Sequence, residues 1–436
     1  MKYIKHLMVA ALILASMFEL QAQFTLSGQF RNRAEYRDGY KTLPTANSND
    51  YWLVAQRTRL TFDYAAEKFI IKATVQDARI WGEDKWKADN MGIGLYEGYG
   101  IYNFNEALSL QVGRQEIAYD DARLFTNGDW RTYGETHDAA RLMYKNKGFT
   151  AIAGFSVNNN ASAELDAFGT NYDLRASQYK NMTHLWLNQK LMDDALNISF
   201  IAVYDGHQKA DGVDTAGNAV YYPQDILYRT TVGPYIKFMK GMIGLEGAFY
   251  YQTGTNSMEK TINANFYNVL ATVKPVKGLA VMVGYDHYSG TNFDPENPSA
   301  EDNTFNTLTG PGHKYLGFMD YFGIPSNHKA GINDLLVRLE YGFNKKMNKV
   351  QATYHNFMLD QGFLASGTAV DKALGSEVDL VFVHKFSKHV NLKAGYSFLL
   401  PTESMEKLKK VTPGTSEFAQ FGWIQLEFNP MFFTTK

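Results

Sequence analysis

Arginine side chains are concentrated in the first part of the sequence, most of them before residue 176. Two pairs stand at a spacing of two residues, Arg31 with Arg33 and Arg57 with Arg59. A guanidinium group binds a carboxylate through a planar, bidentate fork that lysine cannot reproduce. If the four side chains share one wall, we expect that wall to form a basic track for an anionic solute or a sugar acid.

Other charged residues extend this candidate site. The further residues that we expect to line the same interior are Arg79, Arg114, Arg141, Glu35, Asp63, Glu97, Arg338, Glu340, Glu377 and Asp379. Their mixture of signs leaves a second hypothesis open, in which the arginines pair with carboxylates such as Glu35 and Asp63 and brace the wall. Both roles can hold in one pore. The acidic residues of the last strands, Glu340, Glu377, Asp379 and Glu427, also predict a field of mixed sign.

The residues around these arginines alternate in character. In residues 24–36 the odd-numbered positions, including Arg31 and Arg33, are polar, whereas most even-numbered positions are apolar or small. Side chains alternate across a β-strand, so the pattern predicts one apolar and one charged face. Arg114 falls in phase with apolar Val112, which predicts a bulge or a strand end there. Eighteen such segments lie near residues 24–36, 54–65, 68–78, 94–104, 107–117, 136–145, 148–158, 182–191, 195–205, 226–238, 242–253, 262–274, 278–288, 331–344, 347–359, 374–386, 389–400 and 417–429.

The connections between these segments alternate strictly between short and long. Short turns are predicted at residues 66–67, 105–106, 146–147, 193–194, 239–241, 275–277, 345–346 and 387–388. Long connections include residues 37–53, 118–135, 206–225, 289–330 and 401–416. Bacterial outer-membrane barrels have an even number of strands, short periplasmic turns and long extracellular loops. The pattern therefore predicts an all-β fold, a single transmembrane antiparallel up-and-down β-barrel of about 18 strands.

The N-terminal residues indicate export from the cytoplasm. Lys2 and Lys5 precede an apolar run from Leu7 to Phe18, and Ala22 offers a small residue for cleavage. This order is typical of a secretory signal peptide, and the run is shorter than the ~20 residues of a membrane-spanning helix. We expect residues 1–22 to be the signal peptide and residues 23–436 to form one barrel in the bacterial outer membrane.

Composition excludes several classes of protein. The chain has no cysteine and a net charge of −2, which argues against disulfide chemistry and nucleic-acid binding. The adjacent pairs His137-Asp138 and Asp286-His287 would face opposite sides of a strand, so no catalytic site is predicted. One long loop could bind calcium, but we favour a solvated loop; its candidate ligands are Asp294, Glu296, Asn297, Glu301, Asp302 and Asn303. No cofactor or metal is expected.

The sequence resembles the alginate-export family of outer-membrane barrels, in the version common among the Bacteroidetes. The stretches that carry the resemblance are FRNRAEY at 30–36, QRTRL at 56–60, QDARIWG at 76–82, VGRQE at 112–116, GSEVDL at 375–380 and GYS at 395–397. The resemblance covers nearly the whole mature chain. It implies an eighteen-stranded monomer whose arginine-lined constriction passes a polyuronate outward.

These observations predict a channel in outer-membrane lipid for polar, anionic or saccharide solutes, including uronate-containing polysaccharide. Part of residues 289–330 is expected to fold into the pore mouth and restrict flow, because long connections in compact proteins are usually functional or disordered. A first alternative is a barrel with a plugged pore whose long loops bind a ligand at the cell surface. A second alternative is an outer-membrane enzyme.

Overall fold

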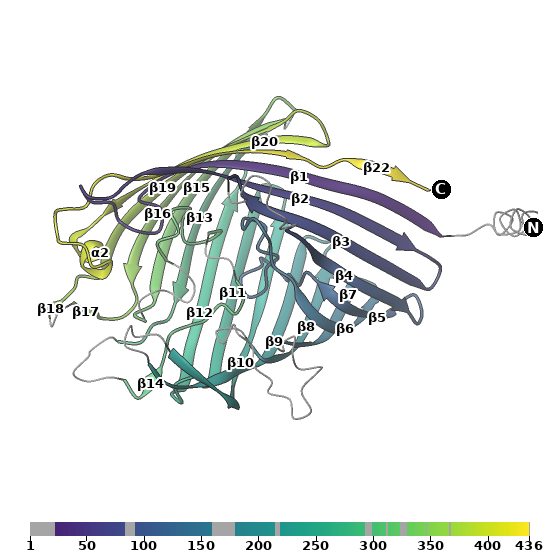
Figure 1. The fold of residues 1–436 in the computed structure, drawn as a ribbon, viewed down its shortest axis with the longest axis horizontal. Helices are drawn as coiled ribbons and strands as arrows, with labels where there is room; N and C mark the ends of the chain where they lie inside the picture. Colours follow the sequence, from purple (N-terminus) through teal and green to yellow (C-terminus); the bar gives the residue numbers. More distant parts are fainter. Residues whose placement is uncertain are drawn as a thin grey trace, which may run out of the picture.

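A computed structural model describes residues 22–82, 92–158, 179–213, 219–292, 299–310, 313–322, 329–345, 347–365 and 368–435. The predicted signal peptide lies outside these residues except for Ala22, as do Asp294, Glu296 and Asn297. Eighteen long antiparallel strands dominate the fold (Figure 1). They are β1 (Gln23–Asp38), β2 (Tyr51–Ala65), β3 (Phe69–Ile80), β4 (Ile93–Asn103), β5 (Leu108–Gln115), β6 (His137–Asn146), β7 (Phe149–Val157), β8 (Asn181–Leu191), β9 (Leu196–Val213), β10 (Ala219–Lys240), β11 (Ile243–Thr255), β12 (Thr261–Val273), β13 (Leu279–Tyr288), β15 (Ile332–Phe343), β16 (Asn348–Leu359), β19 (Ala373–Lys385), β20 (Val390–Pro401) and β21 (Ala419–Phe428).

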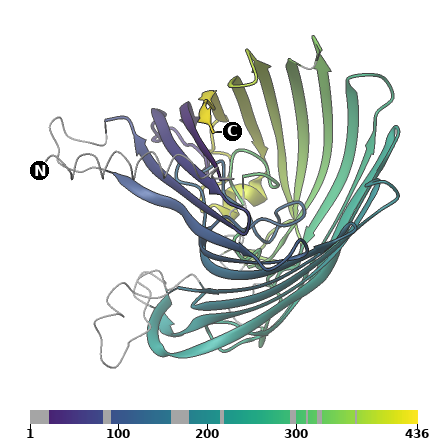
Figure 2. The ribbon, with the colours of Figure 1, turned by 90° about the vertical axis from the view of Figure 1, so that its right-hand side faces the viewer.

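The sheet closes on itself because β1 pairs with both β2 and β21. Arg31 on β1 lies opposite Arg57 on one side and opposite Glu427 on the other. Figure 2, which views the molecule from the right-hand side of Figure 1, shows the strands as a ring around loops in the interior. A closed sheet has no edge, so its backbone polar groups pair with one another within lipid. The predicted eighteen-stranded antiparallel barrel is confirmed.

Each strand separates a lipid-facing row from a lumen-facing row of side chains. On β15, Leu335, Val337 and Leu339 are exposed on the outside, whereas Asp334 and Leu336 are buried on the inside. A charge at the membrane midplane would cost roughly 2–4 kcal/mol on the outer face of such a barrel. The alternation read from the sequence therefore reports which face meets lipid.

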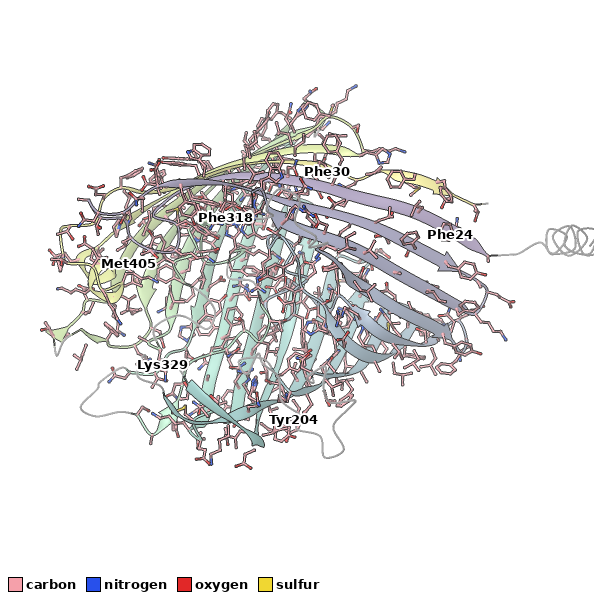
Figure 3. The ribbon with its side chains drawn as sticks, viewed as in Figure 1. Phe24, Phe30, Tyr204, Phe318, Lys329 and Met405 are labelled. Atoms are coloured by element: carbon pink, nitrogen blue, oxygen red, sulfur yellow. The ribbon has the colours of Figure 1, made fainter. Side chains whose placement is uncertain are left out.

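The short turns join neighbouring strands at one end of the barrel, and both termini lie at that end (Figure 1). Figure 3 marks Phe24 toward this end of β1 and Met405 at the opposite end, where the long connections gather. Lys147 and Gly148 in the turn between β6 and β7 both have positive φ, the backbone geometry that tight hairpins favour. The predicted alternation of short and long connections is confirmed at most positions, but the connections from β9 to β10 and from β11 to β12 are only five residues long.

Several local features differ from the sequence-based expectation. The predicted loop 206–225 is mostly a hairpin, since β9 runs on to Val213 and β10 starts at Ala219. Residues 206–212 are mostly polar and Ala219–Tyr222 do not alternate in character, so the alternation pattern did not identify this stretch as strand. The small elements β14 (Glu301–Asp302), β17 (Leu364–Ala365), β18 (Thr368–Ala369), α2 (Glu403–Leu408) and β22 (Met431–Thr434) were also not predicted. Among the described residues, no helix has the length and apolar character needed to cross a bilayer.

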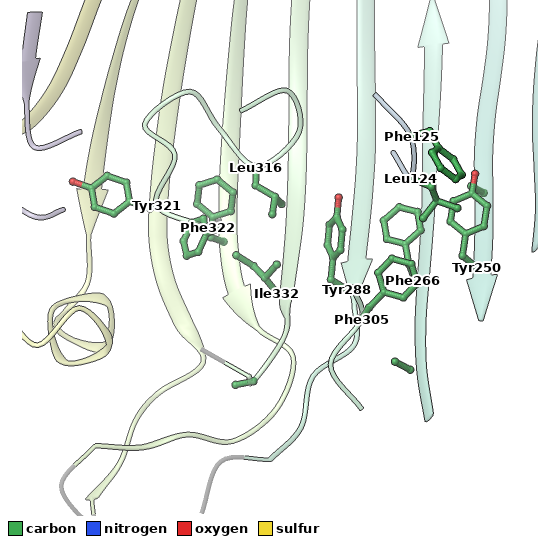
Figure 4. Packing of buried hydrophobic residues seen from close by; sticks show 14 of the residues in the cluster. Leu124, Phe125, Tyr250, Phe266, Tyr288, Phe305, Leu316, Tyr321, Phe322 and Ile332 are labelled. Atoms are coloured by element: carbon green, nitrogen blue, oxygen red, sulfur yellow. The ribbon is translucent and has the colours of Figure 1, made fainter. Parts of the chain in front are cut away.

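Two long connections fold into the barrel, the second in the parts that the structure describes. We call residues 116–136, between β5 and β6, the first inward loop, and residues 289–331, between β13 and β15, the second inward loop. Leu124 and Phe125 of the first loop pack beside Tyr250 on β11, as Figure 4 shows. Tyr321 and Phe322 of the second loop are fully buried. The hydrophobic core of this molecule is therefore formed by loops against the inner wall.

Candidate functional site

Arg31 and Arg57 lie opposite each other on β1 and β2 and are almost completely buried, with 3% and 0% of their surface exposed. Arg31 donates hydrogen bonds to the carbonyl oxygens of Asp129 (2.5 Å) and Arg131 (3.0 Å). Arg57 donates to the carboxylate of Asp129 at 2.6 Å. Charge-assisted hydrogen bonds of this kind are about twice as strong as neutral ones. The two arginines hold the first inward loop against the wall.

Arg33 continues this arrangement toward the long-loop end of β1. Its guanidinium pairs with Glu35 at 2.6 Å, donates to the carbonyl oxygen of Trp130 and lies 3.7 Å from the centre of the Trp130 ring. Arg59 on β2 donates to Gln76 at 2.7 Å. It also lies 3.4 Å from the centre of an aromatic ring on β4. Cation–π contacts are strongest where water is excluded. Each of these two guanidinium groups is therefore held in place both by hydrogen bonds and by an aromatic ring against its flat face.

The first inward loop also reaches far sides of the ring. Its Arg123 forms a bidentate ion pair with Asp286 on β13, at 2.6 and 2.9 Å. Its Asp120 accepts hydrogen bonds from Ser199 on β9 (2.6 Å) and Trp186 on β8 (3.1 Å). β9 is eight strands from β1 in the ring of eighteen, close to diametrically opposite. The loop therefore crosses the lumen.

Two carboxyl groups of this loop have opposite pKa shifts. Burial raises the pKa of Asp120 to about 6, against the hydrogen bonds from Ser199 and Trp186. Burial alone would also raise the pKa of Asp129, but the guanidinium groups of Arg57, Arg31 and Arg59 together more than offset it, so this pKa lies below its usual value. Of the two carboxyl groups, Asp129 is the one held by an arginine.

The second inward loop packs on the first. His313 stacks on Trp130 with ring centres 3.8 Å apart, and the side chain of Lys314 donates to the carbonyl oxygen of Asp121 at 2.7 Å. On its other side, the backbone N–H of Met319 donates to Glu377 on β19 at 2.8 Å. Together the two loops form one layer inside the barrel, held by contacts with each other and with the wall.

The acidic wall predicted near the C-terminus is buried beneath this layer. Glu377 and Asp379 on β19 have 0% and 1% of their surface exposed. His355 on β16 lies between Asp334 (2.7 Å) and Asp379 (3.5 Å). These carboxylates are thus engaged by His355 and by the second inward loop.

The sequence analysis did not identify a set of lysine–carboxylate pairs on the inner face toward the short-turn end. Each pair joins neighbouring strands, and the four pairs are spread around the ring. They are Lys72–Glu97 (2.8 Å), Lys237–Glu246 (2.9 Å), Lys349–Glu340 (3.0 Å) and Lys393–Glu427 (3.5 Å). Of these residues, Glu97, Glu340 and Glu427 were predicted to face the lumen, but their lysine partners were not identified. The lysines share the lumen-facing phase of their strands, and that phase was a signal available in the sequence. We call these eight residues the paired-charge ring.

A comparison with protein families gives one decisive result. The model of the family described as "Alginate export" matches residues 22–414, which is most of the chain. The chain belongs to the alginate export family. A comparison with curated protein sequences finds no match. The family and the barrel fold together place this protein in the bacterial outer membrane as a channel-type barrel.

Solved structures share the fold of this alginate export family member. Pseudomonas aeruginosa OpdL aligns with a TM-score of 0.62 and 13% identity, covering 94% of this chain and 99% of that one. Pseudomonas aeruginosa OpdQ aligns at 0.60 and 12%, covering 94% and 98%. Acinetobacter baumannii OccAB4 aligns at 0.59 and 14%, again covering 94% and 98%. At these identities the likeness concerns the fold alone.

The remaining predicted residues occupy different parts of this alginate export barrel. Arg79 pairs with Asp77 on its own strand near the long-loop end of β3. Arg141 on β6 donates to Gln115 at 2.5 Å and so faces inward. The placement of Arg114 inside the pore is wrong. Arg114 follows the exposed phase of β5 to the outside, because a strand places alternate residues on opposite faces.

Two further predicted residues lie on the inner face closer to the short turns. Asp63 on β2 lies directly opposite Lys72 on β3, next to the paired-charge ring. Arg338 on β15 donates to Thr353 at 3.1 Å. The predicted site residues are therefore divided between a layer that anchors the inward loops and a polar lining beyond it.

Proposed function

We propose that this protein is a constricted diffusion channel for hydrated polar solutes, with saccharides and organic anions as the substrate class. The observation that carries the proposal is the paired-charge ring, with four lysine–carboxylate pairs 2.8 to 3.5 Å apart around the inner wall. Such pairs present donors and acceptors side by side, as a solute rich in hydroxyl and carboxylate groups requires. The substrate class named for the family is consistent with this lining.

The inward loops set the size of the solute in this proposal. The first inward loop contacts β1, β2, β9 and β13, so it narrows the lumen at the level of Arg31 and Arg57. Its backbone carbonyl oxygens take up these guanidinium groups. We therefore assign the arginines an anchoring role first and an electrostatic role second. The expected monomeric state stays a prediction.

A second candidate function is favoured by the burial of the inward loops. Phe125 and Tyr321 have no exposed surface, as expected for a plug more than for a mobile lid. In that case the barrel binds a ligand at the surface and does not conduct. The two functions differ in one measurable property, the flow of ions through the purified protein.

Single-channel recording in a planar lipid bilayer tests the proposal. We expect discrete conductance steps from the wild-type protein and a reversible reduction of current by oligosaccharides or sugar acids. The absence of conductance from folded, heat-modifiable protein would favour the plugged receptor. Conductance that no sugar or sugar acid reduces would contradict the substrate class but leave the channel in place.

A further inference from the structure

The barrel wall has a notch between β4 and β5 at the long-loop end. Pairing between these strands reaches no further than Gly98 with Arg114. β4 begins at Ile93, five residues beyond that pair, where its described partner is β3. β5 ends at Gln115, and the chain then turns inward as the first inward loop. The paired wall therefore extends less far toward the long-loop end here than β4 itself does.

A cavity of about 750 Å³ lies at this notch. Its lining includes Leu95, Arg114 and Asp138, which are exposed on the outer side of their strands. It also includes Tyr96 and His137, which are buried on the inner side. Since residues from both faces line one cavity, the cavity joins the outer rim of the barrel to the lumen. Its volume is within the ~300–1,000 Å³ of small-ligand sites.

With all three lining carboxylates ionised, the charges that line this cavity cancel. Three arginines and three carboxylates meet there, each arginine paired with one acid. The pairs are Arg114 with Asp138 (2.8 Å), Arg131 with Glu135 (3.0 Å) and Arg229 with Asp205 (2.8 Å). A cleft concentrates an ion only where one sign of charge prevails. This cavity therefore has no general attraction for a polyanion, but it presents strong donors and acceptors at its surface.

Aromatic side chains supply the other half of the lining. Tyr133 of the first inward loop is 61% exposed at the cavity. Tyr179 and Tyr96 are buried, with hydroxyl groups 2.6 Å from His137 Nδ1 and from a Glu116 carboxylate oxygen, respectively. A tyrosine ring offers an apolar face and a polar edge. The exposed ring of Tyr133 is thus a surface on which the C–H face of a sugar can stack.

We propose that this cavity is a binding site for a neutral oligosaccharide of a few sugar units, held against the inward loops at the long-loop end of the barrel. The three balanced ion pairs bind hydroxyl groups, and Tyr133 stacks on one sugar ring. The site prefers neutral sugars to uronates because its lining carries as many acids as arginines. The assignment of the bound sugar to transport rests on the proposed channel, whereas the binding itself does not.

Isothermal titration of the purified full-length protein in detergent tests the site. The probes are maltotriose and cellotriose as neutral sugars and trigalacturonate as the charged one. The variant Tyr133→Ala removes the stacking surface. Tyr51→Ala is the matched control, because Tyr51 is exposed at the same end of the barrel but is not part of the cavity lining.

We expect at least one neutral trisaccharide to bind, and trigalacturonate to bind no more tightly. Tyr133→Ala should weaken binding about fivefold, the loss expected for one stacked ring, with the control within twofold of wild type. Heat-modifiability on a gel shows that each variant is folded. The proposal is overturned if folded protein binds neither neutral sugar, if trigalacturonate binds tenfold more tightly, or if Tyr133→Ala changes nothing.

Conductance recorded on the same preparation separates this proposal from the channel function. If the protein conducts but binds neither neutral trisaccharide, the proposed binding site is contradicted and the proposed channel function is not. Non-conducting protein that binds a neutral trisaccharide, with a loss in Tyr133→Ala, supports the site and contradicts transport.

Discussion

At the scale of single residues, Arg31, Arg33 and Arg57 all donate hydrogen bonds to the first inward loop. Arg57 is fully buried, and it donates to Gln29 on β1, to the carboxylate of Asp129 and to backbone carbonyl oxygens of the first inward loop. Hydrogen bonds to charged groups contribute about 1.5–3 kcal/mol each. A few such side chains are enough to hold a loop of this length across a water-filled lumen.

Arg57→Gln should therefore loosen the first inward loop without unfolding the barrel. We expect a higher and noisier single-channel conductance, because the Asp129 carboxylate loses its closest partner, at 2.6 Å. Arg79→Gln is the matched control, since Arg79 pairs with Asp77 near the mouth and not with the loop. Equal conductance in wild type and Arg57→Gln would show that this arginine does not restrain the loop.

The pKa of the Glu135 carboxyl group leads us to predict that ion selectivity depends on pH. Burial raises its pKa to about 7, although the neighbouring Arg131 lowers it. Below that pH the carboxyl group is neutral and the charge of Arg131 is no longer balanced. Acidification should therefore shift selectivity toward anions, a change measurable as the reversal potential in a salt gradient one unit above and one unit below pH 7.

The variant Glu135→Gln isolates this group from the others that face it. Arg59 from β2, His137 and Asp138 from β6 and Tyr96 from β4 also line this region. Glutamine is neutral at every pH, so the variant should show the acid-type selectivity on both sides of pH 7. A variant that retains the full pH dependence would assign it to another of these groups.

At the scale of elements, the second inward loop is an insertion into an otherwise regular hairpin. Thr291 donates its N–H to the carbonyl oxygen of Lys329 at 2.6 Å, so the two ends of the loop adjoin. Gly290 and Gly331 pack against each other there, with no room for a Cβ at Gly290. The strands β13 and β15 thus need no help from the loop to pair along their length.

Replacing residues 292–328 by a two-residue Asn-Gly turn should therefore leave the barrel intact and raise its conductance. The first inward loop would lose the stacking of His313 on Trp130 and the bond from Lys314. Shortening the hairpin between β9 and β10 is the control deletion, and we expect no change in conductance from it. A folded loop deletion with wild-type conductance would show that the second inward loop does not restrict flow.

At the scale of the whole molecule, the ring of strands fixes which connections face the cell surface. Short turns and both termini share one end, and the long connections share the other. In bacterial outer-membrane barrels the short turns face the periplasm. The cavity at the notch then opens toward the outside of the cell, and the paired-charge ring lies nearer the periplasm.

Because the chain has no cysteine, single cysteines can report this topology. Asn47→Cys lies in an exposed long connection, and Lys388→Cys lies in an exposed short turn. In intact cells, a membrane-impermeant maleimide should label the first and not the second. After the outer membrane is permeabilised, both should react. Labelling of Lys388→Cys in intact cells would invert the topology.

The sequence by itself determined that the chain forms a barrel, how many strands the barrel has, and which end carries the short turns. These properties depend on local signals, because alternation with period two marks the strand faces and turn length marks the ends. The outward position of Arg114 was visible in the same way, from its phase with Val112. The membrane makes these signals unusually strong, since lipid imposes one apolar face on every strand.

Only the tertiary structure decided what the lumen-facing residues contact. Arg31 bonds to a carbonyl group one hundred positions away in the sequence, at Arg131. No alternation pattern specifies where an irregular loop settles inside a ring. The paths of the two inward loops were decided by scattered contacts, such as Arg123 with Asp286 and Met319 with Glu377. Such pairings satisfy buried charges and backbone groups only once the barrel has closed around them.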